Sequence, residues 1–180
     1  MGCRFLDLLD RQARNRVFQD VNPCQRGAGH NNCYAAAGAM FDFLATGQRR
    51  AAVCIGPGQG LVLLPDRWTG ADLSTIMRRV LRGGHGTQVL VSGVRAPGSR
   101  FSADHGFLLV NIDPPNGIRR PGRGSVHAVD PYANVLVPDR PGPTFSQSLR
   151  EIRSFYVDWN EVRRFEYRDR RYDVRVVGMP

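Results

Sequence analysis

One cysteine in this chain stands where its sulfur could act as a nucleophile. Cys33 follows the polar loop VNPCQRGAGHNN and begins the run CYAAAGAMFDFLATG, whose apolar spacing is that of a helix. A thiol reacts as its thiolate, and the unpaired N–H groups and dipole at a helix N-terminus stabilise that charge. Gly27 and Gly29 in the preceding loop would let a substrate backbone approach closely. Cys33 is therefore the predicted nucleophile.

A cysteine nucleophile needs a histidine base, and the fold rather than the sequence brings the two together. His105 opens the apolar strand HGFLLVNI, which would hold its ring at a strand end. His85 lies in the turn GGHG, and His127 lies in the middle of SVHAVD, a packing position. His30, three residues before Cys33, could contact the substrate. We therefore expect His105 to be the base.

A third group should orient the imidazole, and the candidates are aspartates. Asp130 ends the strand SVHAVD just before Pro131, and pairing of neighbouring strands would bring it beside His105. Asp104 is adjacent to His105 in sequence and would point to the opposite face, while Asp113 lies at the far end of the same strand. Asp130 is the predicted orienting carboxylate.

Together these three side chains predict acyl transfer to sulfur. Cys33 would attack a carboxamide carbon, and the oxyanion would be held by the backbone N–H of Cys33 and by the side chain of Asn31 or Asn32. His105 would protonate the leaving amine and then activate the water that releases the acid. Deamidation of a glutamine side chain and proteolysis share this chemistry, and the sequence does not choose between them.

The remaining cysteines suggest other uses of sulfur that compete with this hypothesis. Four cysteines are too few for a disulfide scaffold in a chain of this length, and Cys3, Cys24, Cys33 and Cys54 form no paired CxxC motif. Cys24, His30 and Cys33 have the spacing of a partial zinc site, but no second pair of ligands follows. We expect neither a metal nor a cofactor. A Cys24–Cys33 disulfide is an alternative that would abolish the proposed chemistry.

The elements that must position these residues are helices first and strands afterwards. Apolar spacing predicts helices over 4–17, 32–46 and 71–84, the second with Asn31 or Asn32 as N-cap and Gly47 as its stop. From residue 87 the pattern becomes that of strands: TQVLVSGV, HGFLLVNI, SVHAVD, NVLV, and segments near SFYVDW, RRFEYR and YDVRVV. PNGIRRPGRGS and PDRPGPTFS are expected to be surface loops. This order favours an α+β fold in a single domain, residues 1–180, with the Cys33 helix packed on a mostly antiparallel sheet.

Composition bounds the class of protein. The chain has 180 residues and a net charge of +9 without a single lysine, and 42% of its residues are hydrophobic, which is typical of a globular domain. No apolar run is long enough to cross a bilayer, and the N-terminal residues do not resemble a signal peptide. A basic surface favours nucleic acid, anionic membrane or an acidic protein partner, although an arginine-biased genome would give the same composition.

A basic, arginine-rich module that binds nucleic acid or protein is therefore the alternative from another functional class. Residues 150–175 combine eight arginines with six aromatic residues, but they also contain six acids. That near-balance is more typical of solvated strand faces, so nucleic acid is not the expected partner.

Several motifs are similar to a known family. VNP, GAGHNNCYAAAGAMFDFLATGQRRAA, DHGFLLVNI and HAVDPYANV resemble the papain-fold toxins of the glutamine deamidase type, over roughly residues 20–137. The resemblance implies a papain-like fold and a catalytic triad of Cys33, His105 and Asp130. Two positions depart from the family pattern: Asp104 stands where the family usually has Gly, and Tyr132 where it usually has Gln.

The resemblance also implies a setting for the chain. Members of this family usually form the C-terminal domain of larger secreted bacterial polymorphic toxins. It implies a target protein in a recipient cell, action in the cytoplasm of that cell, and a cognate immunity protein. We expect the domain to be a monomer without a transmembrane segment.

Overall fold

A computed structural model describes residues 4–26, 32–54, 59–63, 68–95, 104–113, 122, 124–157, 162–168 and 174–178. The helices are α1 (Arg4–Asp7), α2 (Arg11–Val21), the 3-10 helix η1 (Pro23–Arg26), α3 (Cys33–Thr46), α4 (Leu73–Arg82) and α5 (Phe145–Val157). The strands are β1 (Gln59–Leu63), β2 (Thr69–Ala71), β3 (Gln88–Arg95), β4 (His105–Ile112), β5 (Ser125–Asp130), β6 (Val135–Val137), β7 (Val162–Arg168) and β8 (Val174–Gly178).

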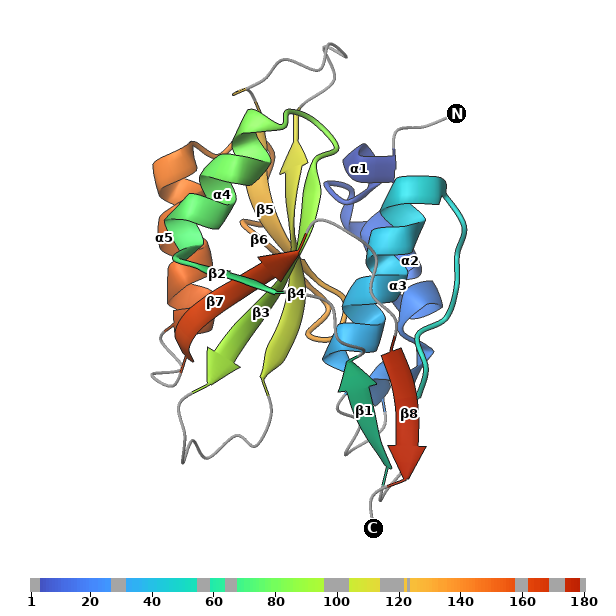
Figure 1. Ribbon diagram of the computed structural model, residues 1–180. Coiled ribbons are helices and arrows are strands. Elements are labelled where there is room, and N and C mark those ends of the chain that lie inside the picture. The colour runs from blue at the N-terminus through green and yellow to red at the C-terminus, as the bar shows by residue number, and fades with distance from the viewer. Residues whose placement is uncertain are drawn as a thin grey trace.

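An antiparallel sheet lies between two layers of helices (Figure 1). Its strand order is β2-β7-β3-β4-β5-β6, with α2 and α3 on one face and α4 and α5 on the other. β1 and β8 pair antiparallel with each other as a separate ribbon. The predicted α+β class is confirmed, with the Cys33 helix on an antiparallel sheet. Neither β1 nor β2 was predicted.

The N-terminal region contains two short helices, so the prediction of one helix over residues 4–17 is wrong. α1 ends at Asp7 and α2 begins at Arg11. Asp10 stands between them, and its carboxylate accepts the N–H of Ala13 at 2.8 Å. A short acidic side chain that bonds a nearby backbone N–H begins a new helix rather than continuing the old one.

α3 matches its predicted bounds to within one residue at its start. It ends where Gly47 adopts a left-handed conformation, with φ of 82°, and donates its N–H to the Phe43 carbonyl at 2.8 Å. Four buried alanines lie along the helix: Ala35, Ala36, Ala37 and Ala39. Because these side chains are small, α3 packs closely on the centre of the sheet. Cys33, the first residue of α3, then lies at one end of the sheet.

β4 and β5 occupy the residues predicted for them and are buried along their whole length. Alternate side chains of β4 point to opposite layers, as the pleat of a strand requires. Leu108 and Val110 join the core under α2 and α3, while Phe107 and Leu109 join the core under α4 and α5. The two central strands therefore form a rigid base for the residues at their ends.

Residues 145–157 form helix α5, although the sequence pattern predicted a surface loop followed by a strand. Ile152 and Tyr156 are four residues apart and both are buried, which is the spacing of a helix face. The helix starts with a capping box: the Thr144 N–H donates to Gln147 Oε1 at 2.9 Å, and the Gln147 N–H donates to Thr144 Oγ1 at 3.3 Å. These reciprocal bonds favour the helix over the predicted strand.

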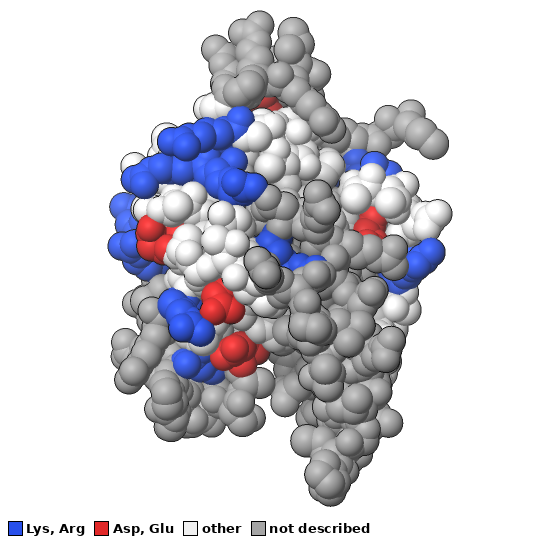
Figure 2. Space-filling model, viewed as in Figure 1, with Lys and Arg blue, Asp and Glu red and all other residues white. Residues whose placement is uncertain are grey.

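Exposed arginines gather over α4, in the layer across the sheet from α3 (Figure 2). They include Arg78, Arg79 and Arg82, and the guanidinium groups of Arg78 and Arg79 lie over the rings of Phe145 and Tyr167. Within the described ranges, no helix is both long and apolar enough to span a bilayer.

Candidate active site

Cys33, His105 and Asp130 come together at one end of the sheet, where α3 and β4 begin and β5 ends. His105 Nε2 lies 2.6 Å from Asp130 Oδ2, and the Cys33 side chain forms a hydrogen bond with the His105 ring. Since Asp130 occupies Nε2, Nδ1 is the ring nitrogen that is left for the sulfur. All three residues are buried, with Asp130 wholly inaccessible.

The sulfur occupies a gap at the edge of β4. The ladder between β4 and β5 ends at Leu108, two residues short of Gly106. The Gly106 N–H donates instead to Cys33 Sγ at 3.4 Å, and the Asp104 carbonyl oxygen lies 3.8 Å from the same sulfur. The end of β5 thus leaves a backbone N–H on β4 for the nucleophile.

Four hydrogen bonds hold the Asp130 carboxylate. Its Oδ2 atom accepts from His105 and from the Tyr156 hydroxyl at 3.1 Å, and its Oδ1 atom accepts from the N–H groups of Tyr132 and Ala133 at 3.1 and 2.9 Å. The two N–H groups belong to the turn that begins at the Asp-Pro pair. Because these four donors fix the carboxylate, it can hold the imidazole in one orientation.

The charge of the imidazole follows from these contacts. Burial by itself would lower the pKa of His105, but the charge and hydrogen bond of Asp130, together with Cys33, outweigh it and raise that pKa to about 10. The ring is therefore cationic at neutral pH and can donate a proton to a leaving group.

Tyr132 lies beside the site. Its ring makes an edge contact with His105, with 5.8 Å between ring centroids, and it is only partly buried. Burial and then the charges of Cys33 and Asp130 raise the pKa of Tyr132. A neutral, partly exposed phenol therefore borders the reacting groups.

Tyr34 packs over the backbone next to the histidine. A Cβ atom at Gly106 would lie 2.5 Å from the Tyr34 ring, so a glycine is needed after His105. The Tyr34 hydroxyl forms a hydrogen bond with Ser92 of β3. The first turn of α3 is in this way fixed to both β3 and β4.

The structure corrects the role expected for Asn32. Asn32 is the N-cap residue of α3, as predicted, but its side chain makes no capping hydrogen bond. Its Nδ2 atom donates to Asn22 Oδ1 at 2.9 Å and to the Val53 carbonyl at 3.4 Å. Both N–H groups are used, so none remains for an oxyanion. Asn31 and His30, the other two expected substrate contacts, lie outside the described residues.

The other candidate titratable groups have local roles. His127 lies within β5, where its Nδ1 atom is 2.9 Å from the Pro138 carbonyl oxygen. Burial lowers the pKa of His127 to about 4. His85 Nδ1 accepts the N–H of Asp113, and Asp104 is exposed and accepts a backbone N–H from β3. None of these groups contacts the imidazole at the site as Asp130 does.

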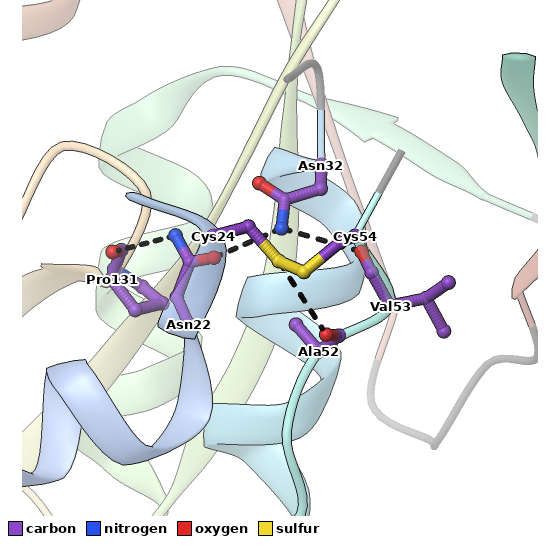
Figure 3. The surroundings of a disulfide bond; sticks show 7 residues. All are labelled: Asn22, Cys24, Asn32, Ala52, Val53, Cys54 and Pro131. Carbon is purple, nitrogen blue, oxygen red and sulfur yellow. Dashed lines mark hydrogen bonds between the residues drawn. A yellow bond between two sulfur atoms is a disulfide. The ribbon is translucent and has the colours of Figure 1, made fainter. Parts of the chain in front are cut away.

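A disulfide joins Cys24 in η1 to Cys54 in the segment after α3 (Figure 3). It replaces the alternative Cys24–Cys33 disulfide and withdraws Cys24 from the possible zinc site. Cys33 is the free cysteine among the described residues. The sulfur of Cys33 therefore remains available for nucleophilic chemistry.

Sequence reasoning did not identify Tyr156 or Asn22 as parts of the site. Tyr156 falls in a segment predicted to be a strand, and the capping box at Thr144 could have indicated the helix, but no local pattern indicates that its hydroxyl reaches Asp130. Asn22 was noted only as part of the VNP motif.

No protein-family model, no curated protein and no solved structure matches this chain.

Proposed function

We propose that this chain is a cysteine-dependent amide hydrolase of papain-like type that deamidates a glutamine side chain of a target protein. One observation carries the proposal. Cys33 is in no disulfide, and its side chain forms a hydrogen bond with the His105 ring. The buried carboxylate of Asp130 holds the other side of that ring, with Oδ2 2.6 Å from His105 Nε2. A nucleophile, a proton carrier and an orienting group in this order are what acyl transfer to sulfur requires.

In the first half-reaction Cys33 Sγ attacks the carboxamide carbon, and the carbonyl π electrons move to the oxygen. The start of α3 is the natural place for this oxyanion, because the Asn32 side chain does not cap the helix and the Cys33 N–H can donate there. His105, cationic at neutral pH, gives its Nδ1 proton to the nitrogen as the C–N bond breaks. Ammonia leaves, and a thioester to Cys33 remains.

In the second half-reaction water replaces the sulfur. Neutral His105 takes a proton from a water molecule as its oxygen attacks the thioester carbon. The C–S bond breaks, and the Cys33 thiolate and the imidazolium are restored. One water is consumed, one ammonia is released, and the glutamine becomes a glutamate.

The setting that we propose rests on the family resemblance. The order of nucleophile helix, His-led strand and strand ending in Asp-Pro supports a domain of the papain-fold toxin type. In that setting the target protein lies in the cytoplasm of a recipient cell, and a cognate immunity protein blocks Cys33. The arginines over α4 lie in the opposite layer from α3, so this cluster is not expected to be the surface through which an inhibitor covers the thiol.

Mass spectrometry of intact proteins tests the reaction. A recipient-cell lysate is treated with the wild type, with Cys33→Ala, and with wild type that has first been alkylated. We expect one protein to gain about one dalton with the wild type alone, because an oxygen replaces an NH group. Fragments would assign the site to proteolysis instead, and identical spectra in all three arms would contradict amide hydrolysis.

A further inference from the structure

A buried chain of hydrogen bonds connects the residue before Cys33 to the residue after Asp130 (Figure 3). Asn32 Nδ2 donates to Asn22 Oδ1 at 2.9 Å, and Asn22 Nδ2 donates to the Pro131 carbonyl at 3.2 Å. Each asparagine is only 1% exposed. The link therefore joins the helix of the nucleophile to the turn that holds the orienting carboxylate.

The orientation of both amides is determined by backbone carbonyls. The Pro131 carbonyl can only accept, so Asn22 must present Nδ2 to it and Oδ1 to its other neighbour. Asn32 must then donate to Asn22, and its second N–H reaches the Val53 carbonyl. Since both ends of the link are acceptors, the two side chains have one consistent arrangement.

The side chain of Asn32 makes this link instead of capping its own helix. An asparagine at an N-cap usually uses its side-chain oxygen to accept a first-turn N–H. Here that oxygen is buried and has no partner among the described residues, which is a costly arrangement for a polar atom. Capping therefore does not explain Asn32, whereas bridging to Asn22 does.

The segments that accept from Asn32 are themselves tied together. The disulfide joins Cys24, two residues after Asn22, to Cys54, the residue after Val53. The Ala52 N–H also donates to a carbonyl at the end of α2 at 2.7 Å. The two segments that accept from the Asn32 amide are thus held to each other by a disulfide and a backbone hydrogen bond.

The contacts close a ring. It runs through covalent neighbours and hydrogen bonds in the order Cys33, Asn32, Asn22, Pro131, Asp130, His105 and back to Cys33. We propose that Asn22 is a positioning residue: it holds the start of α3 against the Asp130 turn and so keeps the sulfur within reach of the imidazole. This inference rests on the proposed function, because it assigns Asn22 a role in that same site.

The chain offers a matched control at the other end of β4. Asn111 is also fully buried, and its Nδ2 atom donates to the carbonyls of Val80 and Leu81. Loss of this amide removes the same kind of hydrogen bonds but touches no member of the ring. A comparison of Asn22→Leu with Asn111→Leu therefore separates positioning of the site from general stability.

Three quantities are measured on the whole chain: the rate of Cys33 alkylation by iodoacetamide at about pH 6, the pKa of His105 by NMR, and the Tm. We expect Asn22→Leu to slow alkylation about tenfold and to lower the pKa of His105 from about 10 only by the smaller part that Cys33 contributes, because the sulfur and imidazole separate while Asp130 stays beside the ring. Asn111→Leu should lower the Tm comparably and leave the rate and the pKa unchanged. If Asn22→Leu does not fold, Asn22→Ser replaces it.

A third variant tests whether Asn22 and Asn32 act as one link. Asn32→Leu should slow alkylation like Asn22→Leu, and the double variant should be no slower than the slower single variant. A wild-type rate and His105 pKa in Asn22→Leu, with only the Tm reduced, would overturn the positioning role and leave the proposed function intact. A wild type whose Cys33 reacts no faster than a cysteine in the unfolded chain would overturn both.

Discussion

Two buried histidines lie on neighbouring strands of the same sheet and differ in what they can do. His105 opens β4 and His127 lies within β5. The ring of His105 contacts the carboxylate of Asp130, whereas the ring of His127 contacts the carbonyl of Pro138. Burial lowers the pKa of both, but at His105 the Asp130 carboxylate, with a smaller contribution from Cys33, reverses the effect. The pKa of His105 is raised to about 10 and that of His127 is lowered to about 4.

The two rings belong to opposite faces of the sheet. His105 stacks with Phe107 and Tyr156 in the layer of α4 and α5. His127 pairs with Val110, which belongs to the core under α2 and α3. A buried histidine is by default a neutral packing residue, and it becomes a proton carrier where a fixed carboxylate is buried with it.

The largest expected effect comes from exchange of each histidine for glutamine. His105→Gln removes the proton carrier, so we expect Cys33 alkylation at about pH 6 and deamidation to fall about a thousandfold. His127→Gln should leave both rates unchanged. The rates are followed by mass spectrometry of the Cys33 adduct, with Cys33→Ala as the blank. Equal losses in the two variants would refute the difference between the two histidines.

A smaller effect is expected when the carboxylate alone is removed. Asp130→Asn leaves His105 buried with a neutral partner, as His127 is, so its pKa should fall below the ordinary value of 6.5. We expect alkylation of Cys33 at about pH 6 to slow about a hundredfold. An NMR titration of the ring follows the pKa, and Asp104→Asn, at an exposed neighbour, is the control. A His105 pKa that stays raised in Asp130→Asn would show that the carboxylate is not its cause.

The smallest expected effect is on stability, and the two histidines act with opposite signs. The folded pKa of His127 lies below its unfolded value, so the unfolded chain binds more protons and stability is lost as pH falls from 6.5 toward 4. This loss is about 2 kcal/mol between pH 7 and pH 5. The folded pKa of His105 is raised, so its contribution is present below 6.5 and is lost as pH rises toward 10.

Urea unfolding at a series of pH values measures these slopes. His127→Gln should flatten the acid side of the stability curve and leave the alkaline side as it is in the wild type. An acid slope that is the same in wild type and His127→Gln would mean that other groups cause it.

Local pattern was enough to predict the parts of the site that depend on neighbours in sequence. The start of α3 at Cys33, its stop at Gly47, and the strands that begin at His105 and end at Asp130 all lie where the sequence places them. Helix and strand periodicity, helix caps and helix-breaking residues act over a few residues, so they can be recognised in a single sequence.

Contacts between distant segments were decided by the tertiary structure. Cys24 pairs with Cys54, Tyr156 on α5 reaches Asp130, and Asn32 bridges to Asn22 instead of capping its own helix. The capping box at Thr144 indicates the helix at 145–157, but no local pattern indicates what its Tyr156 hydroxyl contacts. An amide, a hydroxyl or a thiol has several local uses of similar free energy, about 1 kcal/mol each. Packing chooses among them, because it decides which distant carbonyl, carboxylate or sulfur is buried beside the group and must be satisfied.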